Sequence, residues 1–116
     1  MNLARPLLVS TDSDLIDECS RLAAASGTEV HVTTHAMSDR SRWTQASIVL
    51  IDVPSALGVS DLPRRSGVIV VTQGASDSVD PAAWRAAVAI GAEQVACLPD
   101  AETWLIERLG ASTDEP

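Results

Sequence analysis

Four short, continuous apolar runs are the feature that most restricts the fold of this chain. They cover residues 6–10, 46–53, 67–72 and 94–98 and are mostly rich in Val, Ile or Leu. Because apolar residues in these runs do not alternate with polar ones, each run predicts a strand buried on both faces. Strands of this kind are typical of a parallel sheet that lies between layers of helices.

A fifth segment, residues 29–35, alternates instead. Val30 and Val32 share one face and the residues beside them share the other, which predicts a strand with one face less covered, such as an edge strand. His31 and His35 would lie about 13 Å apart along that strand. This distance is too long for one metal ion to bridge, so we expect no metal site there.

Helical spacing of apolar residues fills most of the intervening segments. Helices are predicted over residues 14–26, 81–90 and about 101–109, each with a Gly after it, Gly110 in the last case. Asp12 or Ser13 can cap the first of them, and an Asp precedes each of the other two. Residues 39–45 can form only a short helix or turn. Residues 54–66 hold two prolines and a glycine with little helical period, so the third helix is expected to be shortened or missing.

Alternating strands and helices predict an α/β fold, a doubly wound, five-stranded parallel sheet of flavodoxin-like order 2-1-3-4-5. The length of 116 residues suits one domain. We assign residues 1–110 to that domain and residues 111–116, which are polar and end in Pro, to a linker or disordered tail.

Composition excludes several functions. The chain has eight Arg and sixteen Asp and Glu, which gives a net charge of −8. Neither nucleic acid nor an anionic membrane surface is therefore expected as a partner. The chain has no Lys, which excludes a phosphate-binding P-loop within it. Its two cysteines lie in apolar periodic segments, and no apolar stretch approaches the length of a membrane span, so we expect a cytoplasmic domain with buried thiols.

Polar side chains gather where the predicted strands end. In an open α/β sheet, ligands bind beyond the carboxyl ends of the strands. The residues that the predicted topology brings to this edge are Thr11, Asp12, Ser13, Asp14, Asp52, Thr72, Gln73, Leu98 and Pro99. A flavin phosphate would have to lie on residues 10–14, which contain two acids and no glycine, so no cofactor is expected.

The segments LLVSTDSD, IVLIDVPS, VIVVTQG and GAEQVACLPD resemble the response-regulator receiver (CheY-like) family. The resemblance implies that Asp52 matches the phosphoacceptor, Asp12 the second acid of a magnesium-binding pair, Thr72 the switch hydroxyl and Pro99 the conserved proline. Thr11 stands where the first acid belongs, and Leu98 stands where the family has its lysine.

These departures predict a non-catalytic pseudo-receiver, a regulatory or protein-interaction module with a vestigial pocket, because phosphoryl transfer depends on cations that neutralise the transferred group. Two alternatives stay open at the pocket. Asp52 is a working phosphoacceptor in one, and Asp12 and Asp52 are ordinary helix-capping or turn residues in the other.

More narrowly, residues 62–72 and 82–99 resemble the N-terminal domain of actinobacterial septum-site-determining proteins. These proteins are CpaE-like members of the MinD/ParA superfamily. The resemblance implies a downstream ATPase domain and a role in septum placement or in pilus or secretion systems.

Trp84, Arg85, Val88 and Trp104 lie on the last two predicted helices. The resemblance implies that receivers pair through helix four, strand five and helix five, so these residues are candidates for self-association or for a protein partner. The alternative is that both tryptophans anchor the core.

Overall fold

Each of the four apolar runs forms a strand, and the alternating segment forms a fifth. The computed structural model describes residues 5–34, 40–58, 65–73, 81–98 and 100–113. Along the chain the elements are β1 (Leu7–Val9), α1 (Ser13–Ala25), β2 (His31–Thr33), α2 (Arg40–Gln45), β3 (Val49–Asp52), α3 (Val53–Leu57), β4 (Val68–Gln73), α4 (Pro81–Ile90), β5 (Gln94–Leu98) and α5 (Glu102–Thr113).

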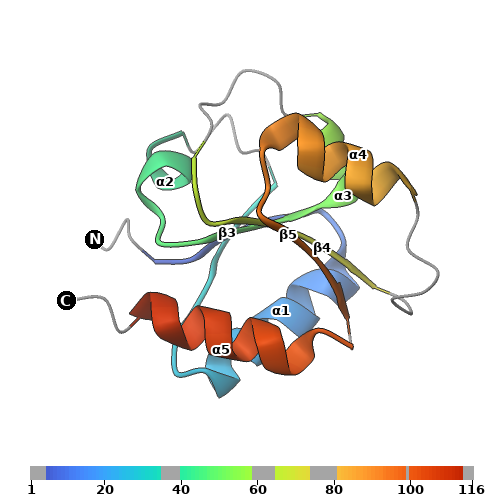
Figure 1. Cartoon of the computed structure of the whole chain (residues 1–116). Helices are drawn as coiled ribbons and strands as arrows, with labels where there is room; N and C mark the ends of the chain where they lie inside the picture. The colour runs from blue at the N-terminus through green and yellow to red at the C-terminus, as the bar shows by residue number, and fades with distance from the viewer. Residues whose placement is uncertain (1–4, 35–39, 59–64, 74–80, 99, 114–116) are drawn as a thin grey trace.

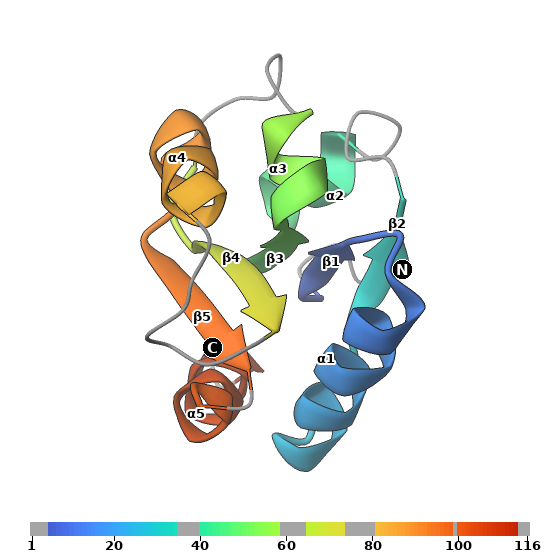
Figure 2. The same ribbon diagram turned by 90° about the vertical axis from the view of Figure 1, so that its right-hand side faces the viewer.

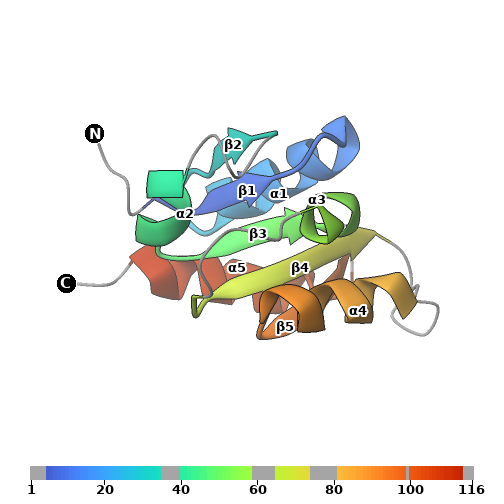
Figure 3. The ribbon, with the colours of Figure 1, turned by 90° about the horizontal axis from the view of Figure 1, so that it is seen from above.

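All strand pairs are parallel, and the strand order is β2-β1-β3-β4-β5 (Figure 3). In the register of the central pairs, Leu8 lies beside Leu50, and Leu50 beside Ile69. The predicted flavodoxin-like order is therefore confirmed. β2 is an edge strand as predicted, although shorter than expected, and Val32 on it is 37% exposed.

Helices cover both faces of the sheet (Figures 1 and 2). α2, α3 and α4 lie on one face, and α1 and α5 lie on the other. Because successive side chains of a strand point to opposite faces, Leu7 and Val9 pack in the layer under α2–α4, whereas Leu8 packs in the layer under α1 and α5. Trp43 of α2 is the large aromatic anchor of the first layer, with 1% of its surface exposed.

The third helix is shortened, as predicted, to the five residues of α3. It begins at the residue after β3 with no intervening loop, and Pro54 lies in its first turn, where a missing N–H costs nothing. Asp52 is therefore both the last residue of a buried strand and the N-cap of a helix. This direct connection places the Asp52 carboxylate at the carboxyl edge of the sheet.

The last helix is longer than predicted. α5 runs through Gly110 to Thr113, so the expectation that Gly110 ends it is wrong, and the first part of the segment assigned to the tail is helical. Gly27 and Gly91 do end helices, with φ of 86° and 71°. Gly110 instead lies within the helix beside Ser26, at the end of α1, where a Cβ would meet Ser26 at 3.9 Å. Among the described residues, no helix has the length and apolar character that crossing a bilayer demands.

Candidate functional site

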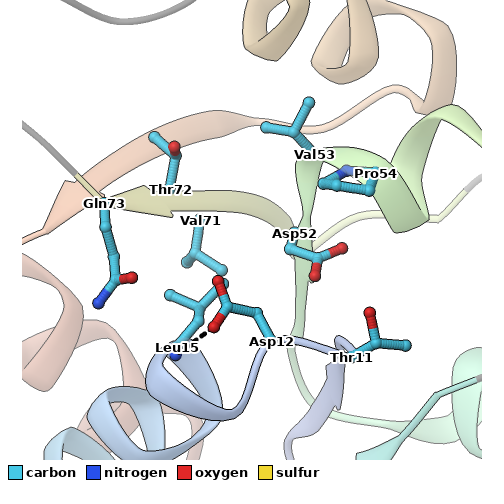
Figure 4. A pocket seen from close by; sticks show the side chains of 9 residues that line it. All are labelled: Thr11, Asp12, Leu15, Asp52, Val53, Pro54, Val71, Thr72 and Gln73. Carbon is cyan, nitrogen blue, oxygen red and sulfur yellow. Dashed lines mark hydrogen bonds between the residues drawn. The ribbon is translucent and has the colours of Figure 1, made fainter.

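A pocket of about 300 Å³ opens at the carboxyl ends of β1, β3 and β4 (Figure 4). It includes five of the residues that the sequence places at this edge, Thr11, Asp12, Asp52, Thr72 and Gln73. Its lining consists of Thr11, Asp12, Leu15, Asp52, Val53, Pro54, Val71, Thr72 and Gln73. None of these nine side chains carries a positive charge.

Asp52 is the buried acid of this pocket, with 5% of its surface exposed. Both of its carboxylate oxygens are hydrogen-bonded. Oδ2 accepts from the hydroxyl of Ser10 at 2.7 Å, and Oδ1 accepts from the backbone N–H of Ser55 at 2.8 Å. The second bond satisfies one of the free N–H groups at the start of α3, which is the ordinary work of an N-cap side chain.

Ser10 is the hydrogen-bond partner of Asp52 that sequence reasoning missed. It follows β1 directly, is fully buried, and joins two segments, because its hydroxyl donates to Asp52 and accepts from the backbone N–H of Asp12 at 3.0 Å. One sequence signal could have revealed it. A hydroxyl that ends a fully buried apolar strand must find a hydrogen-bond partner inside the protein.

Asp12 lies at the exposed mouth of the pocket and begins α1. Its Oδ1 accepts from the backbone N–H groups of Asp14 at 3.0 Å and Leu15 at 3.4 Å (the latter drawn in Figure 4). The helix-capping alternative that the sequence left open is thus the structural role of both Asp12 and Asp52.

Of the remaining sequence candidates, Thr11 and Thr72 line the pocket, whereas Leu98 does not. Thr72 is half-buried on β4 and points to the side of the strand opposite Gln73 (Figure 4). Thr11 is exposed at the rim. Leu98 is 2% exposed, belongs to the core layer under α1 and α5, and does not line the pocket. Pro99 lies outside the described residues.

Metal-ligating side chains do not converge here. Among the residues that the structure describes, no group of three or more His, Cys, Asp or Glu lies close enough together to hold a metal ion. The thiols are buried in the two core layers, Cys19 in one and Cys97 in the other. Burial raises the pKa of the Cys19 thiol to about 12.

The candidate interaction residues form a second surface. Trp84 is 55% exposed and Val88 is 76% exposed, so the core-anchoring alternative is wrong for Trp84, while Trp104 on α5 is 37% exposed. A groove of about 340 Å³ lies between α4 and β5. Its lining consists of Trp84, Ala87, Val88, Gly91, Ala92, Glu93, Gln94 and Val95.

An ion pair joins this groove to α5. Arg108 donates to Oε1 of Glu93 at 2.9 Å, and Arg108 lies one helical turn after Trp104. Trp84 lies on α4 and Trp104 on α5, and partner binding through these residues stays a prediction.

Comparison with known proteins agrees with the fold. Residues 9–116 match the family model described as the Rv3660c-like, CheY-like N-terminal domain. The proteins named Rv3660c and MT3760, from two strains of Mycobacterium tuberculosis, are 35% identical over 107 residues. Those residues are 90% of this chain and 30% of the relatives, so the chain spans under a third of their length.

A solved structure shows the same architecture. It is HP1043, described as an orphan response regulator of H. pylori, with a TM-score of 0.54 and 16% identity. The match covers 96% of this chain and 97% of that one. At this identity the likeness concerns the fold alone.

Proposed function

This chain belongs to the Rv3660c-like family of CheY-like N-terminal domains, and we propose that it is a non-catalytic pseudo-receiver that acts through protein contacts. The observation that carries this proposal is the state of Asp52. The side chain at the phosphoacceptor position is buried, caps α3, and uses both oxygens in hydrogen bonds to Ser10 and Ser55.

Phosphorylation of Asp52 would work against this network. The Asp52 oxygen that attacks the phosphoryl donor would have to lose a hydrogen bond, either the one from the Ser10 hydroxyl or the one that caps α3. Loss of the cap costs about 1 kcal/mol by itself. The product would carry a charge of roughly −1.5 to −2 where the free carboxylate carries −1, in a pocket that already holds Asp12. No basic side chain lines the pocket to neutralise that charge, whereas efficient phosphoryl transfer depends on such neutralisation.

Leu98 supports the same conclusion. A lysine here would have to bury an ammonium in the apolar layer or reach past it to the pocket, whereas leucine completes the packing under α5. The position that the family uses for a cation therefore contributes to the hydrophobic core in this chain.

Incubation of the purified chain with acetyl phosphate and Mg²⁺ tests the proposal. Intact mass spectrometry is expected to show no phosphoryl adduct, while a phosphorylatable receiver in the same tube acquires one. An adduct on this chain that is lost in Asp52→Asn would overturn the proposal and establish a working phosphoacceptor.

We further propose that the longer relatives couple this module to a MinD-like ATPase in septum placement, pilus assembly or secretion, on the cytoplasmic side of the membrane. The support is the sequence resemblance of residues 62–72 and 82–99. The relatives have room for a second domain, since this chain spans 30% of their length. A nucleotide-binding assay on a full-length relative tests this, and failure to bind ATP would contradict it.

A further inference from the structure

Arg65 is a half-buried cation that precedes β4, and backbone carbonyl groups hold its guanidinium. Its Nε donates to the carbonyl oxygen of Ser66 at 2.8 Å, and its Nη1 donates to that of Trp43 in α2. These bonds leave Nη2 without a partner among the described residues, although a guanidinium has five donors in all. No carboxylate in the described part of the chain pairs with Arg65. Burial lowers the pKa of Arg65 because it takes the charged form out of water.

A second guanidinium lies beside the first. The Nη2 atoms of Arg65 and Arg108 are 3.5 and 3.8 Å from the position that a Cβ would occupy on Gly67, just before β4. The two nitrogens are therefore at most about 7 Å apart, which one carboxylate can bridge because each charge-assisted hydrogen bond covers about 2.8 Å. We call these two residues the arginine pair.

Gly67 allows both arginines to approach the backbone closely. Its φ of 75° lies in the left-handed region, and an added Cβ would also meet the carbonyl oxygen of Ser47 at 3.3 Å. Gly67 is buried, whereas Ser66 beside it is exposed and the Arg108 side chain is 31% exposed. A ligand can therefore reach the arginine pair from solvent.

Charge selects the kind of anion that suits this position. Each arginine carries one positive charge, and the Glu93 carboxylate, which accepts from Arg108 at 2.9 Å, balances one of the two. A single carboxylate balances the charge that is left. A phosphate monoester carries roughly −1.5 to −2 at neutral pH, so Glu93 and the net charge of −8 would repel it more strongly.

The arginine pair lies at the amino edge of the sheet, since Gly67 immediately precedes β4. The parallel strands run from this edge to the edge that holds the acidic pocket (Figure 3). The two sites are therefore at opposite ends of the strands. A ligand on the arginine pair leaves Asp12 and Asp52 untouched.

From this geometry and charge, we infer that Arg65 and Arg108 bind a carboxylate in an acidic segment of a protein partner, with each guanidinium donating to one carboxylate oxygen. A partly exposed ion pair stabilises little by itself, so the carboxylate is expected to belong to a larger surface that docks at this edge. The inference rests on the proposed function, in which the domain acts through protein contacts, and it assigns those contacts a place and a ligand chemistry.

An NMR titration of the ¹⁵N-labelled chain at low ionic strength measures binding directly. The probes are a capped Gly-Glu-Glu-Gly peptide and the matched Gly-Gln-Gln-Gly peptide. The signals that report binding are the amide of Gly67 and the Nε–H groups of Arg65 and Arg108. The Glu peptide is expected to shift them saturably, with a Kd on the order of millimolar, and the Gln peptide is expected to leave them in place.

Four variants separate this site from a general effect of charge. Arg65→Gln is expected to weaken binding at least about fivefold, and Arg65→Lys is expected to recover part of that loss. The matched control is Arg85→Gln, which removes the same charge from an exposed position of α4 and is expected to change the Kd less than about twofold. Glu93→Gln is expected to tighten binding roughly two- to fivefold, because it removes the carboxylate that competes for Arg108.

A structural role for Arg65 alone, as a cation beside the last carbonyls of α2, predicts a change in stability without any of these changes in binding. Circular dichroism of each variant distinguishes loss of the site from an unfolded chain. If Arg65→Gln does not fold, Arg65→Lys and Glu93→Gln still test the inference.

The inference is overturned if the Glu peptide leaves the three signals in place or if the Gln peptide shifts them equally. It is also overturned if Arg85→Gln weakens binding as much as Arg65→Gln, or if Glu93→Gln weakens binding. Inorganic phosphate that binds more tightly than the Glu peptide would overturn the choice of a carboxylate. None of these results bears on the assay with acetyl phosphate, which reports on Asp52, so the pseudo-receiver proposal is tested separately.

Discussion

Replacement of Asp52 by Ala is expected to lower the free energy of unfolding by about 2–4 kcal/mol. Loss of the N-cap of α3 accounts for about 1 kcal/mol of this. The hydroxyl of Ser10, which is fully buried, would lose its acceptor, and a stranded buried polar group costs about 1–3 kcal/mol. Both costs follow from the structural role of the carboxylate and not from any chemistry at the pocket.

Urea unfolding followed by circular dichroism measures this loss. Thermal unfolding measures the same loss as a change in Tm. For a domain of this size, 1 kcal/mol corresponds to a decrease in Tm of about 4 °C, so the expected decrease is about 8–16 °C. Asp52→Asn keeps an oxygen that can accept from Ser55, and Asn caps a helix about as well as Asp, so this variant should lose less than Asp52→Ala.

A double-mutant cycle with Ser10→Ala isolates the bond between the two side chains. The expected coupling is at least about 1 kcal/mol, within the range for residues in direct contact. The reasoning is refuted if Asp52→Ala is as stable as the original chain or more stable. That result would mean that Asp52 lowers the stability of the fold, as residues of functional sites often do, and it would favour a working phosphoacceptor.

Three further predictions concern the core, the turns and pH. Trp43→Ala should cost about 3–5 kcal/mol in urea unfolding because Trp43 is 1% exposed, whereas Trp84→Ala, at an exposed position, should cost under about 1 kcal/mol. Gly27→Ala should cost about 1 kcal/mol through the backbone alone, since φ is 86° and an added Cβ would meet nothing within 4 Å. Burial raises the pKa of Cys19 to about 12, so the stability that comes from its neutral thiol is fully present below the unfolded-state pKa, about 8.5. The free energy of unfolding should decrease as pH rises from there toward 12. Cys19→Ala should reduce this pH dependence when unfolding is measured at a series of pH values.

Local signals in the sequence were sufficient for most of the architecture. The non-alternating runs could be buried only in a sheet covered on both faces, and a parallel sheet requires crossover helices between its strands. Gly27 and Gly91 end their helices as predicted because a positive φ is a local property of the backbone. Gly110 does not, because it is absent from the glycines with positive φ and lies within α5, which continues to Thr113.

The candidate site was only partly predictable. That Asp12 and Asp52 lie in one pocket follows from the topology, since parallel strands end at a common edge. The exposure of Trp84 and the burial of Trp43 did not follow, because Trp84 lies among the apolar residues of α4 yet is exposed, whereas Trp43 lies among the polar residues of α2 yet is buried. The difference depends on which side of each helix meets the sheet.

The sequence by itself determined a five-stranded α/β domain with leucine at the position where receivers have a lysine. Only the tertiary structure decided what the remaining acids do. Ser10 and Asp52 are 42 residues apart in the chain, and their side chains meet at 2.7 Å because β1 and β3 are neighbours in the sheet. The partner of a buried carboxylate depends on such distances between remote segments, and periodicity and capping patterns carry no information about them.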